Sequence, residues 1–262
     1  MSRLSSDTLF HYVHRKEYLL DILLNDFHPR YVKEKLLFQS GELQEVAMPM
    51  LCFCDITLSN ISEHVEWYGS YGIGMKKEWA ISKGLTPVHY YNPLSHVIKE
   101  LSVSIDGMKK ALDLNGDTNL IHSFIGYYYN LWFMKQYNGT QYKPSLNKEV
   151  EKKFYDEREW RYIPSLEELR NLGKGTSMSI VGQNLLRFNS NPTYKQEINN
   201  KLREDISLDF GPSDISYIII KDESDRADMI RKIKHAKQKF DRDTIELLFS
   251  KIVSLEQIRK DF

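Results

Sequence analysis

The sequence predicts a single α+β domain over residues 1–262, built on a mixed, largely antiparallel sheet with flanking helices and a helical insertion at residues 93–137. Two observations lead to this fold class. Short segments rich in aromatic and β-branched residues alternate with longer stretches whose apolar residues follow helical spacing. The connections between them are irregular in length, which favours α+β organisation over regular β-α-β units. A chain of 262 residues is also near the upper limit for one hydrophobic core.

The first third of the chain shows clear alternation between strand and helix. Leu20, Leu23, Leu24 and Phe27 recur at i, i+3, i+4 and i+7, which predicts an amphipathic helix. Pro29 then ends it. In order, we expect a strand at 9–13, a helix at 16–25, a loop at 33–47, a buried strand at 49–56, a helix at 58–67 and a glycine-rich strand at 68–75.

The remaining elements are predicted from the same signals. The insertion consists of two long helical stretches separated by Asn115, Gly116 and Asp117. In order, we expect a helical turn at 76–83, a strand at 86–91, the insertion, a surface loop at 138–152, strands at 157–163 and 215–220, helices at 194–204 and 223–234, a strand at 245–253 and a last helical turn at 254–260.

Charge and hydropathy exclude several classes of protein. The chain carries 36 Lys and Arg against 36 Asp and Glu, so it has no surplus of positive charge with which to coat nucleic acid. No apolar run approaches the ~20 residues that span a bilayer. The N-terminus lacks the apolar core of a signal peptide, and we therefore expect a cytoplasmic protein.

The two cysteines, Cys52 and Cys54, are candidates for metal binding. Two residues apart on a strand, they point to one face but have poor geometry for a disulfide. A structural zinc site needs four ligands, so His64 and His89 would have to complete it. The ordinary alternative is that both thiols are small buried apolar side chains, and we expect no metal.

Glu157 and Glu159 are the candidate catalytic residues. They stand two apart in a predicted strand, so both carboxylates should project from one face. Like charges this close raise the pKa of one member, which suits a pair that divides acid, base or hydrogen-bonding work. The alternative is a solvated strand face paired to Lys or Arg.

Four residues are candidates for binding a cofactor. His11 and Tyr12 lie at the end of the first strand, just before a helix N-terminus that could favour a phosphate or ribose. Tyr68 and Tyr71 lie beside glycines and could stack on a planar ring. Surface capping and core packing are the respective alternatives. The chain has no Gly-x-Gly-x-x-Gly, Gly-x-Ser-x-Gly or His-Glu-x-x-His motif.

Several of these segments together resemble the AbiGi family of abortive phage resistance proteins. They are Pro49–Ile56, His64, Tyr68–Met75, Glu78-Trp79, Pro87–Tyr90, His11-Tyr12 and Glu157–Arg161. The resemblance covers most of the chain. It implies a bacterial two-component phage-exclusion system in which this protein is described as an antitoxin, with an operon-encoded toxin or antitoxin as its partner.

The order of a His-Tyr strand, an aromatic middle and a late Glu-x-Glu strand is also similar to ADP-ribosyltransferases. That resemblance implies NAD as co-substrate, with a nucleic-acid or protein target. Glu159 would hold the ribose 2′-hydroxyl, Glu157 would orient the acceptor, His11 would bind a ribose or the amide, and Tyr68 or Tyr71 would stack on nicotinamide. The Ser-Thr-Ser strand of one transferase branch is missing. The alternative is a non-catalytic antitoxin or sensor; a metal-dependent nuclease is disfavoured because no ligand cluster is visible.

Overall fold

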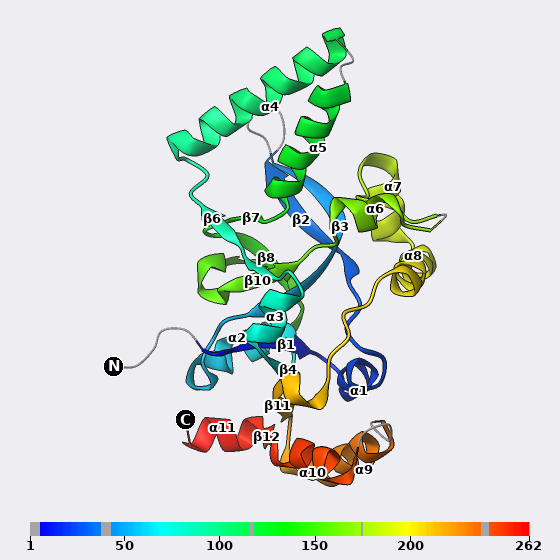
Figure 1. Cartoon of the computed structure of the whole chain (residues 1–262). Coiled ribbons are helices and arrows are strands. Elements are labelled where there is room, and N and C mark those ends of the chain that lie inside the picture. The colour runs from blue at the N-terminus through cyan, green and yellow to red at the C-terminus, as the bar shows by residue number, and fades with distance from the viewer. Residues whose placement is uncertain (1–5, 38–42, 116–117, 174, 237–240, 262) are drawn as a thin grey trace.

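A computed structural model of the chain describes residues 6–37, 43–115, 118–173, 175–236 and 241–261, and a twisted sheet runs through its centre (Figure 1). The strand order is β12-β11-β4-β1-β3-β10-β5, and β2 pairs with the first part of β3. The strands of this sheet are β1 (Thr8–Val13), β2 (Arg30–Leu37), β3 (Leu43–Cys54), β4 (Tyr71–Lys76), β5 (Thr86–Pro87), β10 (Glu159–Tyr162), β11 (Ile215–Ile220) and β12 (Ile252–Ser254).

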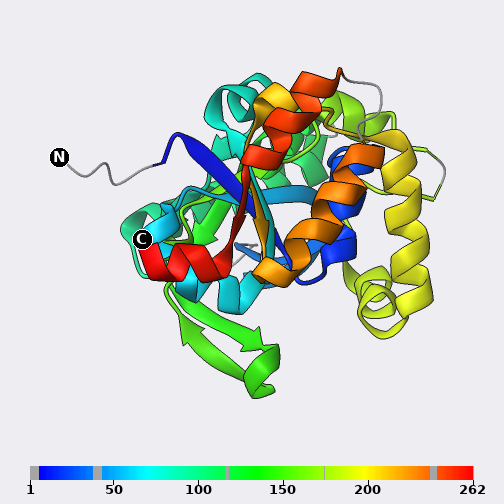
Figure 2. The same cartoon turned by 90° about the horizontal axis from the view of Figure 1, so that it is seen from below.

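The sheet is mixed and largely antiparallel, as predicted. Within it only the β11–β12 pair is parallel among the described residues. Two small sheets lie outside it, a parallel pair of β6 (His89–Tyr91) with β7 (Met134–Gln136) and an antiparallel hairpin of β8 (Gly139–Lys143) with β9 (Lys148–Lys152). Figure 2 shows this hairpin, in green, extending away from the body.

Helices cover both faces of the sheet, and the α+β class is therefore confirmed. The helices are α1 (Lys16–Asn25), α2 (Ile61–Tyr68), α3 (Lys77–Ser82), α4 (His96–Asn115), α5 (Thr118–Leu131), α6 (Leu166–Arg170), α7 (Gly182–Ser190), α8 (Pro192–Asp205), α9 (Arg226–Ala236), α10 (Arg242–Ser250) and α11 (Leu255–Asp261). Short 3₁₀ turns are η2 (Leu58–Asn60), η3 (Pro144–Leu146), η4 (Phe154–Glu157), η5 (Pro212–Asp214) and η6 (Glu223–Asp225).

The main hydrophobic core fills one face of the sheet. There, alternate residues of β1, β3, β4 and β11 pack against α1, α3 and α7 to α10, with Leu23, Phe27 and Leu202 fully buried. Burying each such side chain stabilises the fold by about 1.5–3 kcal/mol.

The opposite face carries two smaller apolar clusters. One packs Phe10, Tyr12 and Cys54 against α2 and α11. The other packs Met48 and Met50 against the end of α5 and against α6. Glu159 and Arg161, which pair with Cys54 and Cys52 of β3, lie on this same face, between the two clusters.

The stretch predicted as a helical insertion contains α4 and α5. The two helices extend together from the body at the top of Figure 1 and pack mainly on each other along their outer length. The boundaries of this insertion, and the assignment of the whole chain to one domain, stay predictions.

Three predicted elements are wrong, two because neighbouring polar segments pair as hairpins and one because a capped helix forms where a strand was expected. The expected loop at 33–47 is largely the β2–β3 hairpin, with residues 38–42 outside the described part, and its Leu36 and Val46 are buried. The expected loop at 138–152 is the β8–β9 hairpin. The expected strand at 245–253 is mostly α10, which Asp241 caps by accepting a hydrogen bond from the Thr244 amide.

Candidate functional site

A cavity of about 220 Å³ lies where β1 and β3 diverge. Within the described part of both strands they share a single register pair, Phe10 opposite Cys54. On its other edge β3 pairs with β10, from Cys54 opposite Glu159 to Leu51 opposite Tyr162. The cavity is lined by residues of β1, β2, β3, β7, β8, β10 and α2, and it therefore draws on segments spread over most of the chain.

His11 bridges the gap between the two strands. Its Nδ1–H donates a hydrogen bond to the carbonyl of Cys52 at 2.8 Å. Its ring lies against those of Phe27 and Phe53, at centroid distances of 5.7 and 5.4 Å. Burial lowers the pKa of His11, so the ring is a neutral donor that fixes how far the strands separate.

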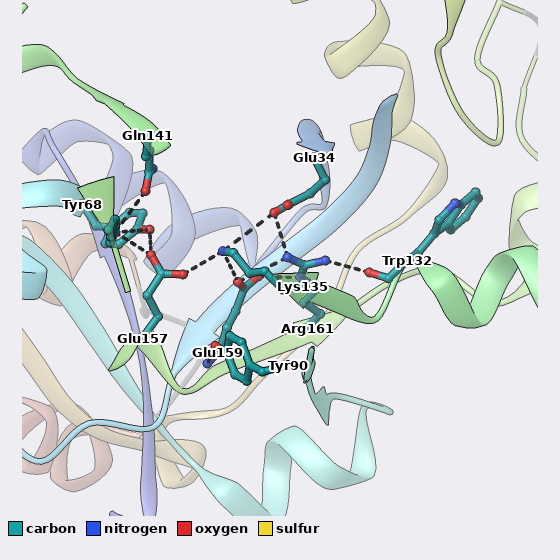
Figure 3. Close-up of polar contacts among 10 residues, drawn as sticks. Glu34, Tyr68, Tyr90, Trp132, Lys135, Gln141, Glu157, Glu159 and Arg161 are labelled. Carbon is teal, nitrogen blue, oxygen red and sulfur yellow. Dashed lines mark hydrogen bonds and ion pairs between the residues drawn. The ribbon is translucent and has the colours of Figure 1, made fainter. Parts of the chain in front are cut away.

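Glu157 and Glu159 meet in this cavity, although not by the strand alternation that the sequence predicts. Glu157 ends the turn η4, and Arg158 follows in the left-handed conformation with φ of 44° before Glu159 begins β10. Both carboxylates nevertheless converge on Lys135 of β7, whose Nζ lies 2.7 Å from an oxygen of each (Figure 3). Both side chains are buried, so the two glutamates do not form a solvated strand face.

Arg161 holds Glu159 from the other side. It is fully buried, and its Nε lies 2.6 Å from Glu159 Oε1. Its Nη2 pairs with Glu34 of β2 at 2.7 Å, and its Nη1 donates to the Trp132 carbonyl at 2.7 Å. The guanidinium thus fixes the orientation of the Glu159 carboxylate.

Lys152 and Tyr68 hold Glu157. The Lys152 ammonium, at the end of β9, lies 2.5 Å from Glu157 Oε1 and donates to the Tyr68 hydroxyl oxygen at 3.0 Å. The Tyr68 hydroxyl in turn donates to Glu157. Tyr90 donates nothing to the carboxylates but accepts a hydrogen bond from the Glu159 amide at 2.9 Å.

The charges of this cluster balance. Glu34, Glu157 and Glu159 face Lys135, Lys152 and Arg161. Burial opposes ionisation of Glu159, but Arg161 and Lys135 outweigh it and hold its pKa well below the usual value. The pKa of Glu157 is lowered in the same way by Lys135 and Lys152. Both carboxylates are therefore ionised at neutral pH.

Tyr12 and His64 form the aromatic side of the cavity. The His64 ring lies between those of Tyr12 and Tyr68, at centroid distances of 5.4 and 4.4 Å, and burial lowers its pKa to about 4. Within the described part of the chain, the Tyr12 hydroxyl is the buried side-chain polar group that has no hydrogen-bond partner. Gly72 makes room for this ring, since a Cβ there would lie 2.8 Å from it.

Tyr71 lies elsewhere. Its hydroxyl donates to Asp225 at 2.8 Å, and Asp225 pairs with Lys16 at 2.9 Å. The structure therefore brings together Glu157, Glu159, His11, Tyr12 and Tyr68 around one cavity and leaves Tyr71 outside it. Of the two tyrosines expected to stack on a ring, Tyr68 is the one that lines the cavity.

Cys52 and Cys54 line the cavity as reduced thiols, and burial raises the pKa of both. No group of three His, Cys, Asp or Glu residues suited to a metal ion occurs in the described segments. Among the same segments no helix is long and apolar enough to cross a membrane.

Sequence reasoning missed Lys135, Lys152 and Glu34. Glu34 and Lys152 lie among other charged residues, and Lys135 is an isolated charge in an aromatic stretch with no acidic residue near it in sequence. The one available signal is indirect: buried carboxylates at Glu-x-Glu require cationic partners from elsewhere in the chain.

Comparison with known proteins gives the chain its family. The model of the family described as "Putative abortive phage resistance protein AbiGi, antitoxin" matches residues 25–221, which include the acidic and basic residues of the cluster. A curated protein of Lactococcus lactis subsp. cremoris, "Abortive phage resistance protein AbiGi", is 28% identical over 256 residues, covering 90% of this chain and 99% of the relative. No solved structure matches the chain significantly, so the resemblance to ADP-ribosyltransferases stays a prediction.

The match spans β2 to β11 and hence most of the sheet. The resemblance that the sequence motifs indicate is therefore confirmed, and the chain belongs to the AbiGi family.

Proposed function

We propose that this protein acts in abortive phage resistance and that its cavity binds NAD and transfers ADP-ribose to a nucleic-acid or protein target. One observation carries the proposal: two buried, ionised carboxylates face a cavity walled by Tyr12, His64 and Tyr68. Buried charges are costly to maintain, and such clusters beside a cavity are often functional sites.

The chemistry follows from the charge that develops on the substrate. Cleavage of the bond between ribose C1′ and the nicotinamide nitrogen sends the bonding pair to nicotinamide, which leaves neutral, and positive charge develops on the ribose. A fixed carboxylate stabilises this charge. The acceptor's oxygen or nitrogen then bonds to C1′ and loses its proton to solvent or to a nearby base.

The contacts of the two glutamates support separate roles for them in this proposal. Glu159 is held by Arg161 and Lys135, so it is a rigid negative charge suited to the ribose. Glu157 lies at the side of Tyr68 and Lys152, where it would orient the acceptor. The unpartnered Tyr12 hydroxyl would find its hydrogen-bond partner on the substrate.

The cavity adjoins space for the rest of a dinucleotide. At about 220 Å³ it holds a ring and a ribose, and it shares Lys33, Glu34, Lys135 and Gln141 with a neighbouring pocket of about 600 Å³. That pocket is also lined by Lys35. Its three lysines would contact a diphosphate, although three glutamates, Glu34, Glu45 and Glu149, line the same pocket.

Glu159→Gln tests this proposal. The variant keeps the shape of the side chain and removes the charge, and it should lower NAD consumption by about 100-fold or more. Tyr71→Phe, which alters a tyrosine outside the cavity, is the matched control and should keep the wild-type rate. NAD consumption by Glu159→Gln at the wild-type rate would overturn the transferase function.

A non-catalytic antitoxin is the second candidate. It is favoured by the family description and by the α4–α5 hairpin, which extends from the body and exposes Val97 and Val103. This function predicts that the purified protein neither binds nor consumes NAD and that its expression alone is harmless. Val103→Asp should then abolish neutralisation of the operon-encoded toxin and leave the fold intact.

A further inference from the structure

The Lys152 ammonium occupies an aromatic cage. Its Nζ lies 4.1 Å from the centroid of the Trp67 ring and 4.5 Å from that of the Tyr68 ring. Glu157 closes the cage with an oxygen 2.5 Å from Nζ, and Gln141 accepts a further hydrogen bond at 3.1 Å. Two ring faces and a carboxylate around one point are the arrangement by which proteins bind organic cations.

This cage stands at a boundary between two spaces. Glu157 and His64 line both the cavity and a second pocket of about 310 Å³, and Lys152 and Trp67 line the second pocket. The Lys152 ammonium makes its contacts with three residues of the cavity wall, Tyr68, Gln141 and Glu157. The side chain therefore separates the two spaces.

Lys152 is one of two cations that contact Glu157. The other, Lys135, lies 2.7 Å from the second carboxylate oxygen but is shared with Glu159, also at 2.7 Å. Burial lowers the pKa of Lys152, because so much of its environment is apolar ring surface. Without Lys152 the three carboxylates would face only Lys135 and Arg161, so a ligand that replaces this ammonium must itself carry a positive charge.

Lys152 is also carried on a separate element. It is the last residue of the β8–β9 hairpin, which pairs with no strand of the central sheet among the described residues. The hairpin contacts α2 through a second lysine, Lys143, which pairs with the exposed Glu66 at 3.0 Å and lies 4.9 Å from the Trp67 ring. Lys152 can thus leave the cage without breaking the sheet.

We propose that Trp67, Tyr68 and Glu157 form a binding site for a planar organic cation, and that Lys152 is an autoinhibitory plug that such a ligand must displace. The pyridinium ring of NAD is a cation of this class, and its identification as the ligand rests on the proposed function. The cage as a binding site for a planar organic cation does not rest on that function. Displacement of Lys152 joins the cavity to the second pocket and admits a larger substrate.

Lys152→Met removes the ammonium and keeps an apolar stem. The probe is 1-methylnicotinamide, which is a pyridinium cation because its ring nitrogen is methylated. It is titrated against the intrinsic Trp and Tyr fluorescence, with neutral nicotinamide as the uncharged comparison. We expect Lys152→Met to bind the cation at least about tenfold more tightly than wild type and to gain much less for nicotinamide.

Lys143→Met is the matched control, because it removes a lysine from the same hairpin and the same Trp67 ring but outside the cage. It should bind the cation within about twofold of wild type. Lys152→Arg keeps a cation in the cage and should also remain weak. Thermal melting establishes that each variant is folded, and Lys152→Gln replaces Lys152→Met if the latter is not.

Equal affinity of wild type and Lys152→Met for the cation would overturn the proposal, as would an equal gain for neutral nicotinamide. NAD consumption measured on the same variants separates this proposal from the function it rests on. If the cation binds as expected and no variant consumes NAD, the cage stands and the transferase function fails. If wild type consumes NAD but Lys152→Met binds the cation no better, the plug fails and the function stands.

Discussion

Replacing Arg161 tests the view that the cluster is a coupled charge network. Arg161→Met keeps most of the aliphatic volume and removes a guanidinium that is fully buried. It breaks ion pairs of 2.6 Å to Glu159 and 2.7 Å to Glu34 and leaves the Trp132 carbonyl without its donor. Removing one partner of a buried pair costs about 3–5 kcal/mol of unfolding free energy. Because Lys135 still faces Glu159, we expect about 3 kcal/mol, plus about 1 kcal/mol for the carbonyl.

The effect should depend on pH with a definite sign. In the wild type the pKa of Glu159 is lowered by Arg161 and Lys135, against burial. The stability it contributes is therefore present above its unfolded pKa of about 4.3 and is lost as the pH falls through the folded value. In Arg161→Met, burial acts with less opposition and the pKa of Glu159 rises. The difference in unfolding free energy between wild type and variant should then become smaller as the pH is lowered from about 7 towards 5.

Urea unfolding at the two ends of this pH range measures the free energy of unfolding of wild type and variant. The control is Arg203→Met, whose guanidinium pairs with Asp21 at the surface and should cost at most about 1 kcal/mol. Arg161→Met combined with Glu159→Gln should lose less than the sum of the two single changes, because the uncompensated charge is gone. A cost for Arg161→Met no larger than that for Arg203→Met, or strict additivity in the double variant, would refute the reasoning.

Three further predictions concern the surroundings of the cavity. Gly69→Ala should destabilise the fold by about 3 kcal/mol, because φ is +112° and the new Cβ would lie 2.3 Å from the Val13 carbonyl oxygen. Gly107→Ala, in open space on α4, should stabilise the fold by about 0.5–1 kcal/mol. Thermal melts measure both changes. Tyr12→Phe should leave stability unchanged or raise it by about 1 kcal/mol while weakening NAD binding in a calorimetric titration, and unchanged NAD binding would contradict its role. The pKa of His64 is lowered to about 4, so the free energy of unfolding of the wild type should fall by up to roughly 3 kcal/mol as the pH drops from about 6.5 to 4. A His64→Phe variant whose stability has the same pH profile would disprove the role of His64.

Local sequence patterns predict most of the sheet and its helices correctly. The spacing of Leu20, Leu23 and Leu24 and the apolar run around Phe53 need no distant partner to be interpreted. The two expected loops and the strand at 245–253 are wrong because short sequence patterns do not show which segments pair or pack together. The β8–β9 hairpin, for example, has few apolar side chains and is held by its own backbone pairing and by lysines that pack on Trp67, a contact that no local pattern encodes.

By itself, the sequence determined the fold class and the family and singled out Glu157 and Glu159, although a turn and not strand alternation brings their carboxylates together. Only the tertiary structure decided what that pair is for. It brings Lys135, Lys152 and Arg161 from three separate elements to the carboxylates, and it places Tyr68 beside them and Tyr71 away from them. The physical reason is that the energy of a buried charge is set by whichever groups surround it in space, whatever their separation along the chain.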